Sequence, residues 1–434
     1  MPTQELFETP TTNFDERLLL AFLTDKLNLN QNRYQQILGI YGNLNSAISS
    51  GFIEMVGIGA KWLTSKTLEK NLDLSKIEEN LNELQKNLTL NNIRILTVED
   101  LEYPKSLKSL DNFPLVLFYQ GNLELLNNPN MVTVVGSRNI DLYAKVVMDK
   151  ILAPACRLGI GVVSGLAIGV DGYSHNIAIE NNAPTIGVIG SGLDQKSFYP
   201  AGNWSLRNRI LGVKSASNNT QNLEKEPTDI LDNDYKKESE IQEVSSVDIN
   251  FFSSNTTQNF SQEFSTNGLV LSEYPPNSKP NLYTFPQRNR LLAALTDLTW
   301  VVQASPKSGS LITSTRARDL NKTVATTPAD IRNNDFGGNI ELLKVGASII
   351  TETEDLLTLL NLKTHPEITF QNKIIIDSVE EQKIYNVLSL NPLEIEEIAI
   401  KSSLDTSTII TSLTLLELNS LAINVGENKW IKGG

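Results

Sequence analysis

The feature that most constrains the fold of this chain is a series of short apolar segments that alternate with helical stretches. The segments MVTVVGS, IGVVSGLA and TIGVIGS are apolar on both faces, and residues with helical spacing follow them. Such strands are typical of a parallel sheet covered by helices on both sides. The alternation resumes after residue 266 with GLVLSEYP, LTWVVQAS, KTVATTP and ASIITE. The sequence therefore predicts one α/β domain, a Rossmann-like, doubly wound and mostly parallel sheet that is interrupted once.

The interruption, residues 213–266, has a different composition from the rest of the domain. Asn, Ser, Thr, Glu and Asp dominate it, and it carries 4 Lys and Arg against 10 Asp and Glu. A segment with so few apolar residues cannot bury enough surface to offset the entropy of ordering, so we predict a disordered loop. This acidic insertion is either a passive loop or a weak competitor for a basic surface of the domain.

A smaller unit precedes the α/β domain, which we place at residues 96–362. Residues 1–95 read as short amphipathic helices and predict a small helical domain. Gly57-Ile58-Gly59 lies between two of these helices. It matches either the glycine turn of a helix-hairpin-helix, where amides approach a phosphate, or an ordinary turn between helices.

A second small unit follows at residues 375–434. Three helical stretches precede LAINVGENKWI, a hairpin with Gly426 in its turn, and this order predicts a winged helix. The helix expected to read DNA, residues 406–418, contains no Lys or Arg. Its composition favours binding of a protein, or packing, over reading of a duplex.

Composition excludes several classes of protein. The chain has one cysteine, Cys156, and two histidines, His175 and His365, so neither a disulfide framework nor a metal-ligand cluster is expected. We expect no metal and no cofactor. The N-terminus lacks the pattern of a signal peptide, and no stretch approaches the ~20 apolar residues that span a bilayer. We therefore expect a cytoplasmic protein without a membrane contact.

The net charge of −13 argues at first against a nucleic-acid partner, because Lys and Arg supply most non-specific affinity for phosphate. The distribution of charge changes that conclusion. Residues 131–212 and 267–350 together carry 16 Lys and Arg against 11 Asp and Glu, so the excess of acid lies outside the α/β core. The local field steers a ligand more than the sum over the chain does, so the mildly basic core is where a polyanion is expected to bind.

Small and basic residues follow the apolar segments, at the positions where parallel strands end. Gly136-Ser137-Arg138 follows the first segment, and Ser164-Gly165 closes the second. Carboxyl ends of parallel strands meet at one edge of a sheet, where amides and a guanidinium group are suited to bind phosphate. One such loop alone is more typical of a structural turn, whereas two on the same edge favour a phosphate cradle.

A second pair of motifs lies in the later half of the domain. FPQRNR, from Phe285 to Arg290, opens a helix with one aromatic ring and two guanidinium groups, and Lys307-Ser308-Gly309-Ser310 leads into another helix. Aromatic faces stack on bases, worth ~1–3 kcal/mol per base, and arginines bind the phosphate backbone. The same residues have structural interpretations: Phe285 as part of the core, and Asn289 and Arg290 as braces of the helix.

The motifs GSR, SGLA-x-G-x-D, His175, YPAGN, LSEYPP, FPQRNR and SGSLIT occur in this order across residues 103–350. In order and spacing they resemble the DNA-processing protein A (DprA/Smf) family. The resemblance implies a homodimer, not an enzyme, that binds and protects single-stranded DNA and helps load the RecA recombinase in natural transformation. The residues that it implies for DNA binding are Gly136, Ser137, Arg138, Ser164, Gly165, Phe285, Arg288, Asn289, Arg290, Lys307, Ser308, Gly309, Ser310 and Thr313.

Several features depart from the family pattern, among them the insertion and TTPADI at residues 326–331 in place of the usual Pro-Gly, and two departures remove basic residues. Ile168 stands where the family often has a basic residue after SGLA, and Asn281-Leu282-Tyr283-Thr284 replaces basic residues before FPQRNR. Fewer cations near the site predict a weaker affinity for DNA. A protein-interaction scaffold without DNA binding also fits these losses.

The strongest alternative is a nucleotide-binding or nucleotide-cleaving enzyme, similar to the lysine-decarboxylase-like phosphoribohydrolases. Those enzymes carry a Pro-Gly-Gly-x-Gly-Thr loop and a nearby glutamate, whereas this chain has Lys307-Ser308-Gly309-Ser310 and no Glu on the helix through Leu320. Asp171 and His175, four residues apart, suit either acid/base catalysis or bracing of a helix start. Without a nucleophile or a metal cluster beside them, bracing is the favoured interpretation.

Overall fold

The structure is a computed structural model that describes residues 13–52, 62–63, 72–213, 267–362, 378–389, 391–418, 421–426 and 428–433. The glycine turn predicted at residues 57–59 lies outside the described residues. So does the predicted disordered insertion, apart from Val213. No helix in the described part of the chain is both long and apolar enough to cross a bilayer.

A sheet forms the centre of the α/β domain, and within the described residues it has nine strands in the order β1-β2-β6-β5-β4-β3-β7-β8-β9. The strands are β1 (Arg94–Thr97), β2 (Val116–Gly121), β3 (Met131–Val135), β4 (Gly161–Ser164), β5 (Thr185–Ile189), β6 (Gly268–Ser272), β7 (Leu298–Val301), β8 (Thr323–Thr326) and β9 (Ser348–Ile349). Neighbours from β6 through β9 pair in parallel. β2 pairs antiparallel with both β1 and β6. The predicted fold class is confirmed.

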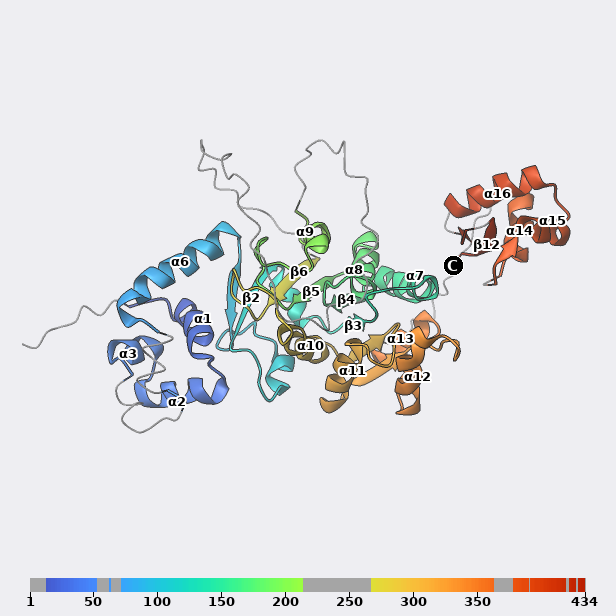
Figure 1. Cartoon of the computed structure of the whole chain (residues 1–434). Coiled ribbons are helices and arrows are strands. Elements are labelled where there is room, and N and C mark those ends of the chain that lie inside the picture. The colour runs from blue at the N-terminus through green and yellow to red at the C-terminus, as the bar shows by residue number, and fades with distance from the viewer. Residues whose placement is uncertain are drawn as a thin grey trace, which may run out of the picture.

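The two faces of β3 explain how the helices are arranged (Figure 1). Val132 and Val134 pack in one buried cluster with residues of α7 and α8, while Met131 and Val135 belong to a second cluster that includes residues of α10. Strands apolar on both faces are stable only when both faces are covered. The helices of this domain are α7 (Leu142–Arg157), α8 (Val170–Glu180), α9 (Trp204–Ile210), α10 (Thr284–Leu295), α11 (Ser310–Asp319), α12 (Gly337–Lys344) and α13 (Thr353–Leu359).

The N-terminal unit packs on the antiparallel edge of the sheet. It contains α1 (Glu16–Leu27), α2 (Gln31–Tyr41), α3 (Leu44–Ser49) and α6 (Ile77–Leu90). The side chain of Asp15 caps α1 by accepting hydrogen bonds from the amides of Arg17 and Leu18. Leu19 and Leu23 are buried in the same cluster as residues of β2, and Arg17 forms an ion pair with Asp100. The boundary predicted between residues 95 and 96 falls within β1.

The C-terminal unit has its own buried cluster, which includes Ile384, Ile398, Leu413 and Trp430. It contains α14 (Val379–Val387), α15 (Ile395–Ser402) and α16 (Thr406–Leu418), with β10 (Leu393–Glu394), β11 (Ala422–Asn424) and β12 (Lys429–Lys432). The three strands pair antiparallel in the order β10-β12-β11. That this unit binds a protein, or serves in packing, and does not read a duplex stays a prediction.

Candidate nucleic-acid interface

β3 is the strand at which the order of the sheet reverses. From β3 the chain adds β4, β5 and β6 on one side, and it then returns to add β7, β8 and β9 on the other. In open parallel sheets, ligands bind outside the carboxyl ends of the strands at such a reversal. The loops after β3, β4, β5 and β7 therefore lie where a ligand is expected.

A small cavity of about 30 Å³ lies at this edge of the sheet. Four of the residues predicted from sequence line it: Arg138, Gly165, Phe285 and Arg288. A cavity of this size holds one small group, whereas pockets that enclose a whole ligand measure roughly 300–1,000 Å³. A nucleotide therefore does not fit inside. The other lining residues are Ala167, Ile168, Gly190, Tyr199 and Pro200.

Aromatic rings form one wall of the cavity. The ring centroids of Tyr199 and Phe285 are 5.5 Å apart with an interplanar angle of 59°, and the Arg138 guanidinium carbon lies 5.9 Å from the Phe285 centroid. Phe285 is half-buried and Tyr199 is 42% exposed, so both rings border the cavity and neither is buried in the core. Tyr199 was absent from the predicted site residues, although it opens the motif YPAGN.

Arg288 forms the floor of the cavity and is only 6% exposed. Its Nη1 donates a hydrogen bond to the carbonyl oxygen of Val188 at 2.7 Å. Its buried Nε has no hydrogen-bond partner among the described residues. Burial lowers the pKa of Arg288, the charge of Arg138 lowers it further, and the charge of Asp171 opposes both. A buried cation with a spare donor favours binding of an anion.

Asp171 and His175 lie on α8, beneath this loop region, and neither lines the cavity. The Asp171 carboxylate accepts hydrogen bonds from the amides of Gly165 at 3.1 Å and Ala167 at 3.4 Å. His175 is fully buried, and its Nδ1 shares a hydrogen bond of 2.7 Å with Thr185 Oγ1. Burial lowers the pKa of His175 to about 3, so its imidazole is neutral at pH 7. These contacts correspond to bracing of the loop and the helix start.

Three other predicted residues shape the ends of β3 and β4. The Ser137 amide donates to the Gln303 carbonyl oxygen at 2.8 Å, and its hydroxyl donates to the Asn139 carbonyl oxygen at 2.9 Å. A Cβ on Gly136 would lie 2.6 Å from Val170 Cγ2, so only glycine fits without a shift. The buried hydroxyl of Ser164 donates to the Val134 carbonyl oxygen at 2.6 Å. None of the three lines the cavity.

The loop after β7 lies on the other side of β3 from β4 and β5, and its residues do not line the cavity. The hydroxyls of Ser308 and Ser310 share a hydrogen bond of 2.7 Å, and Thr313 is buried. Lys307 and Gly309 are exposed. Asn289 links the two sides, because its Nδ2 donates to the Gly309 carbonyl oxygen at 3.5 Å. The structure therefore separates the predicted residues that line the cavity from those in the loop after β7.

Arg290 does not line the cavity and forms an ion pair with Glu273. Its Nη2 lies 2.6 Å from both carboxylate oxygens of Glu273, and the two side chains are only 11% and 23% exposed. Burial raises the pKa of Glu273, while the charge of Arg290 and its hydrogen bond oppose that rise. Of the two interpretations left open by the sequence, this ion pair favours Arg290 as a brace of α10.

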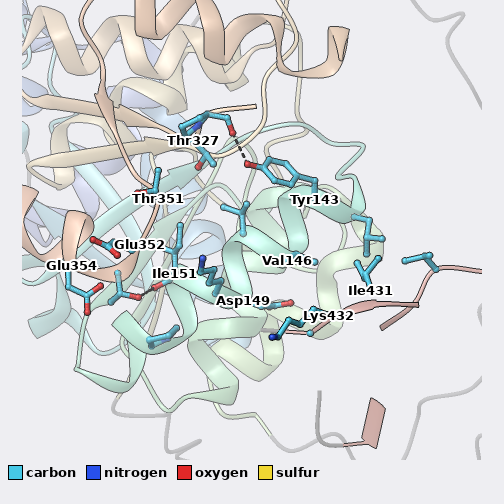
Figure 2. A pocket seen from close by; sticks show the side chains of 18 of the residues that line it. Tyr143, Val146, Asp149, Ile151, Thr327, Thr351, Glu352, Glu354, Ile431 and Lys432 are labelled. Carbon is cyan, nitrogen blue, oxygen red and sulfur yellow. Dashed lines mark hydrogen bonds between the residues drawn. The ribbon is translucent and has the colours of Figure 1, made fainter. Parts of the chain in front are cut away.

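A larger cavity, of about 910 Å³, lies along α7 and contains none of the residues predicted to bind DNA (Figure 2). Tyr143 borders it and donates from its hydroxyl to the Pro328 carbonyl oxygen at 2.7 Å. Its lining also includes Asp149 of α7 and Ile431 and Lys432 of β12. Among the described residues, no group of three or more His, Cys, Asp or Glu side chains is placed to hold a metal ion.

The parallel sheet with its reversal at β3 defines a Rossmann-like α/β protein, and a cavity bordered by arginines and aromatic rings lies at the carboxyl edge of that sheet. A family profile, DNA recombination-mediator protein A, matches residues 94–222 and 243–361, more than half of the chain. The chain therefore belongs to this family, the DprA/Smf proteins, and the resemblance noted in the sequence is confirmed.

Individual relatives agree with this assignment. The DNA processing protein DprA of Bacillus subtilis is 30% identical over 264 residues, which are 61% of this chain and 70% of that protein. The DNA processing protein DprA of Streptococcus pneumoniae is 32% identical over 255 residues, which are 59% of this chain and 70% of that protein. The X-ray structure of DNA processing protein A from Streptococcus pneumoniae superposes with a TM-score of 0.50 at 25% identity, covering 80% of this chain and 99% of that one.

Proposed function

We propose that this protein binds single-stranded DNA, without base specificity, at the carboxyl edge of β3, β4 and β5. The observation that carries the proposal is the cavity that brings Arg138, Arg288 and Phe285 together. The two guanidinium groups suit a phosphate, and the rings of Phe285 and Tyr199 offer a surface on which unpaired bases stack. In a duplex the base faces are already stacked, so this surface favours a single strand.

The remaining predicted residues take supporting roles in the proposal. Gly136, Ser137, Ser164 and Gly165 shape the loops around the cavity. Asn289, next to Arg288 on α10, contacts the loop from Lys307 to Ser310. The proposed binding surface for DNA therefore continues past β3 to this loop. Thr313 supports that loop from α11, and Arg290 holds α10 in place through Glu273.

The experiment that tests this function compares single-stranded and duplex oligonucleotides of one sequence, by fluorescence anisotropy at low salt. The proposal expects the single strand to bind more tightly and its affinity to fall steeply as salt is added. Oligonucleotides of different base composition should bind alike. Equal affinity for the duplex would refute the preference for single strands, and no binding of either ligand would refute the proposal and favour the protein-interaction scaffold.

We further infer, from family membership, a cytoplasmic homodimer that protects incoming single strands and helps load a RecA recombinase in natural transformation. We expect light scattering of the purified protein to give the molecular mass of a dimer. The rate at which RecA filaments form on single-stranded DNA is expected to rise when the protein is present. An unchanged rate would refute the loading of RecA and would not contradict the proposed DNA site.

We also infer that the protein is not an enzyme. The cavity that contains Arg138 and Arg288 is too small to enclose a nucleotide, and Asp171 and His175, the acid/base candidates of the sequence, do not line it. The competing function is cleavage of nucleoside monophosphates. Incubation of the purified protein with nucleoside monophosphates is expected to release no free base, and release of base would favour the enzymatic alternative.

A further inference from the structure

Asp171 is a buried acid whose carboxylate contacts the loop that borders the cavity. The side chain is 6% exposed, and its Oδ2 accepts hydrogen bonds from the amides of Gly165 and Ala167. Both of those residues line the cavity. The carboxylate therefore fixes the backbone at the carboxyl end of β4 from beneath.

The charge of Asp171 also acts on Arg288, the cation in the floor of the cavity. Arg288 is buried, has one hydrogen bond to a carbonyl oxygen and carries a buried Nε without a partner among the described residues. Arg138 adds a second positive charge nearby. Holding two cations beside one cavity is unfavourable without an opposing charge, because the effective dielectric constant falls in a buried site.

The two roles meet at Gly165. Its amide is bound by Asp171, and its Cα faces the guanidinium of Arg288 so closely that no Cβ fits between them. A shift of the loop away from Asp171 would therefore also shift the surface against which Arg288 is packed. The loop, the acid and the arginine form one packed unit.

We propose that Asp171 is a positioning residue of the DNA site, which holds the β4–α8 loop and the buried Arg288 guanidinium in the arrangement that receives a phosphate. This inference rests on the proposed function, and it names an acidic residue as necessary for binding a polyanion. Asp171 does not contact the DNA itself, because it lies behind the loop that lines the cavity.

The variant Asp171→Asn separates this role from simple electrostatics, because the two predict effects of opposite sign. Removing one negative charge raises the local positive potential, so electrostatics alone predicts equal or tighter binding of DNA. A positioning role predicts binding of oligothymidylate about tenfold weaker, or ~1.4 kcal/mol. It also predicts that the slope of log affinity against log salt concentration is flatter by about 0.7, the amount expected when one phosphate contact is lost.

Asp297→Asn is the matched control, since it changes the net charge equally. Asp297 precedes β7, at the amino edge of the sheet, and its side chain is 89% exposed. The control is expected to bind oligothymidylate as the wild type does. If Asp171→Asn binds as tightly as the control while the wild type binds normally, the positioning role is wrong and the proposed function stands. If the wild type does not bind, both fail together.

A stability measurement covers the case in which Asp171→Asn does not fold. Arg288→Met removes the cation and leaves the Asp171 carboxylate buried without its opposing charge, which is strongly unfavourable. Adding Asp171→Asn to that variant is therefore expected to raise the urea midpoint above that of Arg288→Met alone. A double variant no more stable than Arg288→Met would show that the two charges are not coupled and would overturn the inference.

Discussion

Arg288 packs against Gly165 so closely that a Cβ added to the glycine would overlap the guanidinium. Gly165 is therefore required for space, and its φ is not among those in the left-handed region. The contact joins the end of β4 to α10, two elements far apart in the sequence. It fixes the place of the buried cation in the cavity.

Replacement of Gly165 by alanine is expected to displace Arg288 and weaken binding of single-stranded DNA. Overpacking of a buried contact costs about 1–3 kcal/mol of the free energy of unfolding. Gly202→Ala is a matched control, because nothing lies within 4 Å of a Cβ at that position. Urea unfolding and anisotropy on both variants check the prediction, and equal stability of the two would contradict it.

Replacement of Phe285 by leucine is expected to remove stacking on a base while keeping an apolar side chain in the wall. The loss is ~1–3 kcal/mol of binding free energy, the usual contribution of one stacked base. An oligonucleotide of abasic sites provides the control on the ligand, since it has no base to stack. The wild type and the variant should bind that ligand alike. A variant that binds both ligands like the wild type would assign Phe285 to packing alone.

Replacement of Arg290 by alanine is expected to destabilise the fold, because it leaves the Glu273 carboxylate buried without its partner. The cost is about 3 kcal/mol of the free energy of unfolding. Addition of Glu273→Gln should recover part of the loss. Arg332→Ala is the control, since Arg332 pairs with Asp330 at an exposed position and should leave stability unchanged. Equal urea midpoints for Arg290→Ala and Arg332→Ala would contradict the bracing role.

The buried His175 is expected to make the fold sensitive to mild acid. Burial, together with the charge of Arg288 on α10, holds the pKa of His175 at about 3, and the Ser164 backbone opposes this only in part. An unfolded chain binds this proton below about pH 6.5, whereas the folded chain does not. The stability linked to His175 is thus complete above pH 6.5 and is lost towards pH 3, by ~1.4 kcal/mol per pH unit.

Urea unfolding at pH 7 and pH 5.5 checks this linkage when the wild type is compared with His175→Gln. The wild type should lose about 1 kcal/mol more than the variant between the two pH values. Other titrating groups contribute equally to both proteins, so the difference isolates His175. Parallel losses in the two proteins would show that the imidazole does not carry the effect.

The sequence predicted the parallel core because β3, β4 and β5 are apolar on both faces, and this pattern depends only on local residues. It also placed Arg138 and Gly165 at one edge, since carboxyl ends of parallel strands meet there. Phe285 and Arg288 were assigned to the same site by the resemblance to the family. The antiparallel edge formed by β1 and β2 was not predicted. β2 is defined by its pairing with β6 and β1 by its pairing with β2, and no local pattern records these contacts.

Two features of the site depended on tertiary contacts. The set of DNA-binding residues implied by the resemblance did not specify that β7 joins the sheet on the opposite side of β3 from β4, which separates Lys307 from the cavity. The ring of Tyr199 meets Phe285 only because the loop after β5 folds back over the start of α10. The tyrosine of the motif YPAGN was the local signal for it.

The central claim is that Arg138 and the cavity beside it bind the phosphates of a single strand. The most direct measurement is the affinity of the wild type and of Arg138→Ala for labelled oligothymidylate, across a salt series from about 50 to 200 mM. We expect the wild type to bind, and the variant to bind more weakly with a logarithmic salt slope flatter by about 0.7, the amount for one phosphate contact. Equal affinity and equal slope for the two proteins would contradict it.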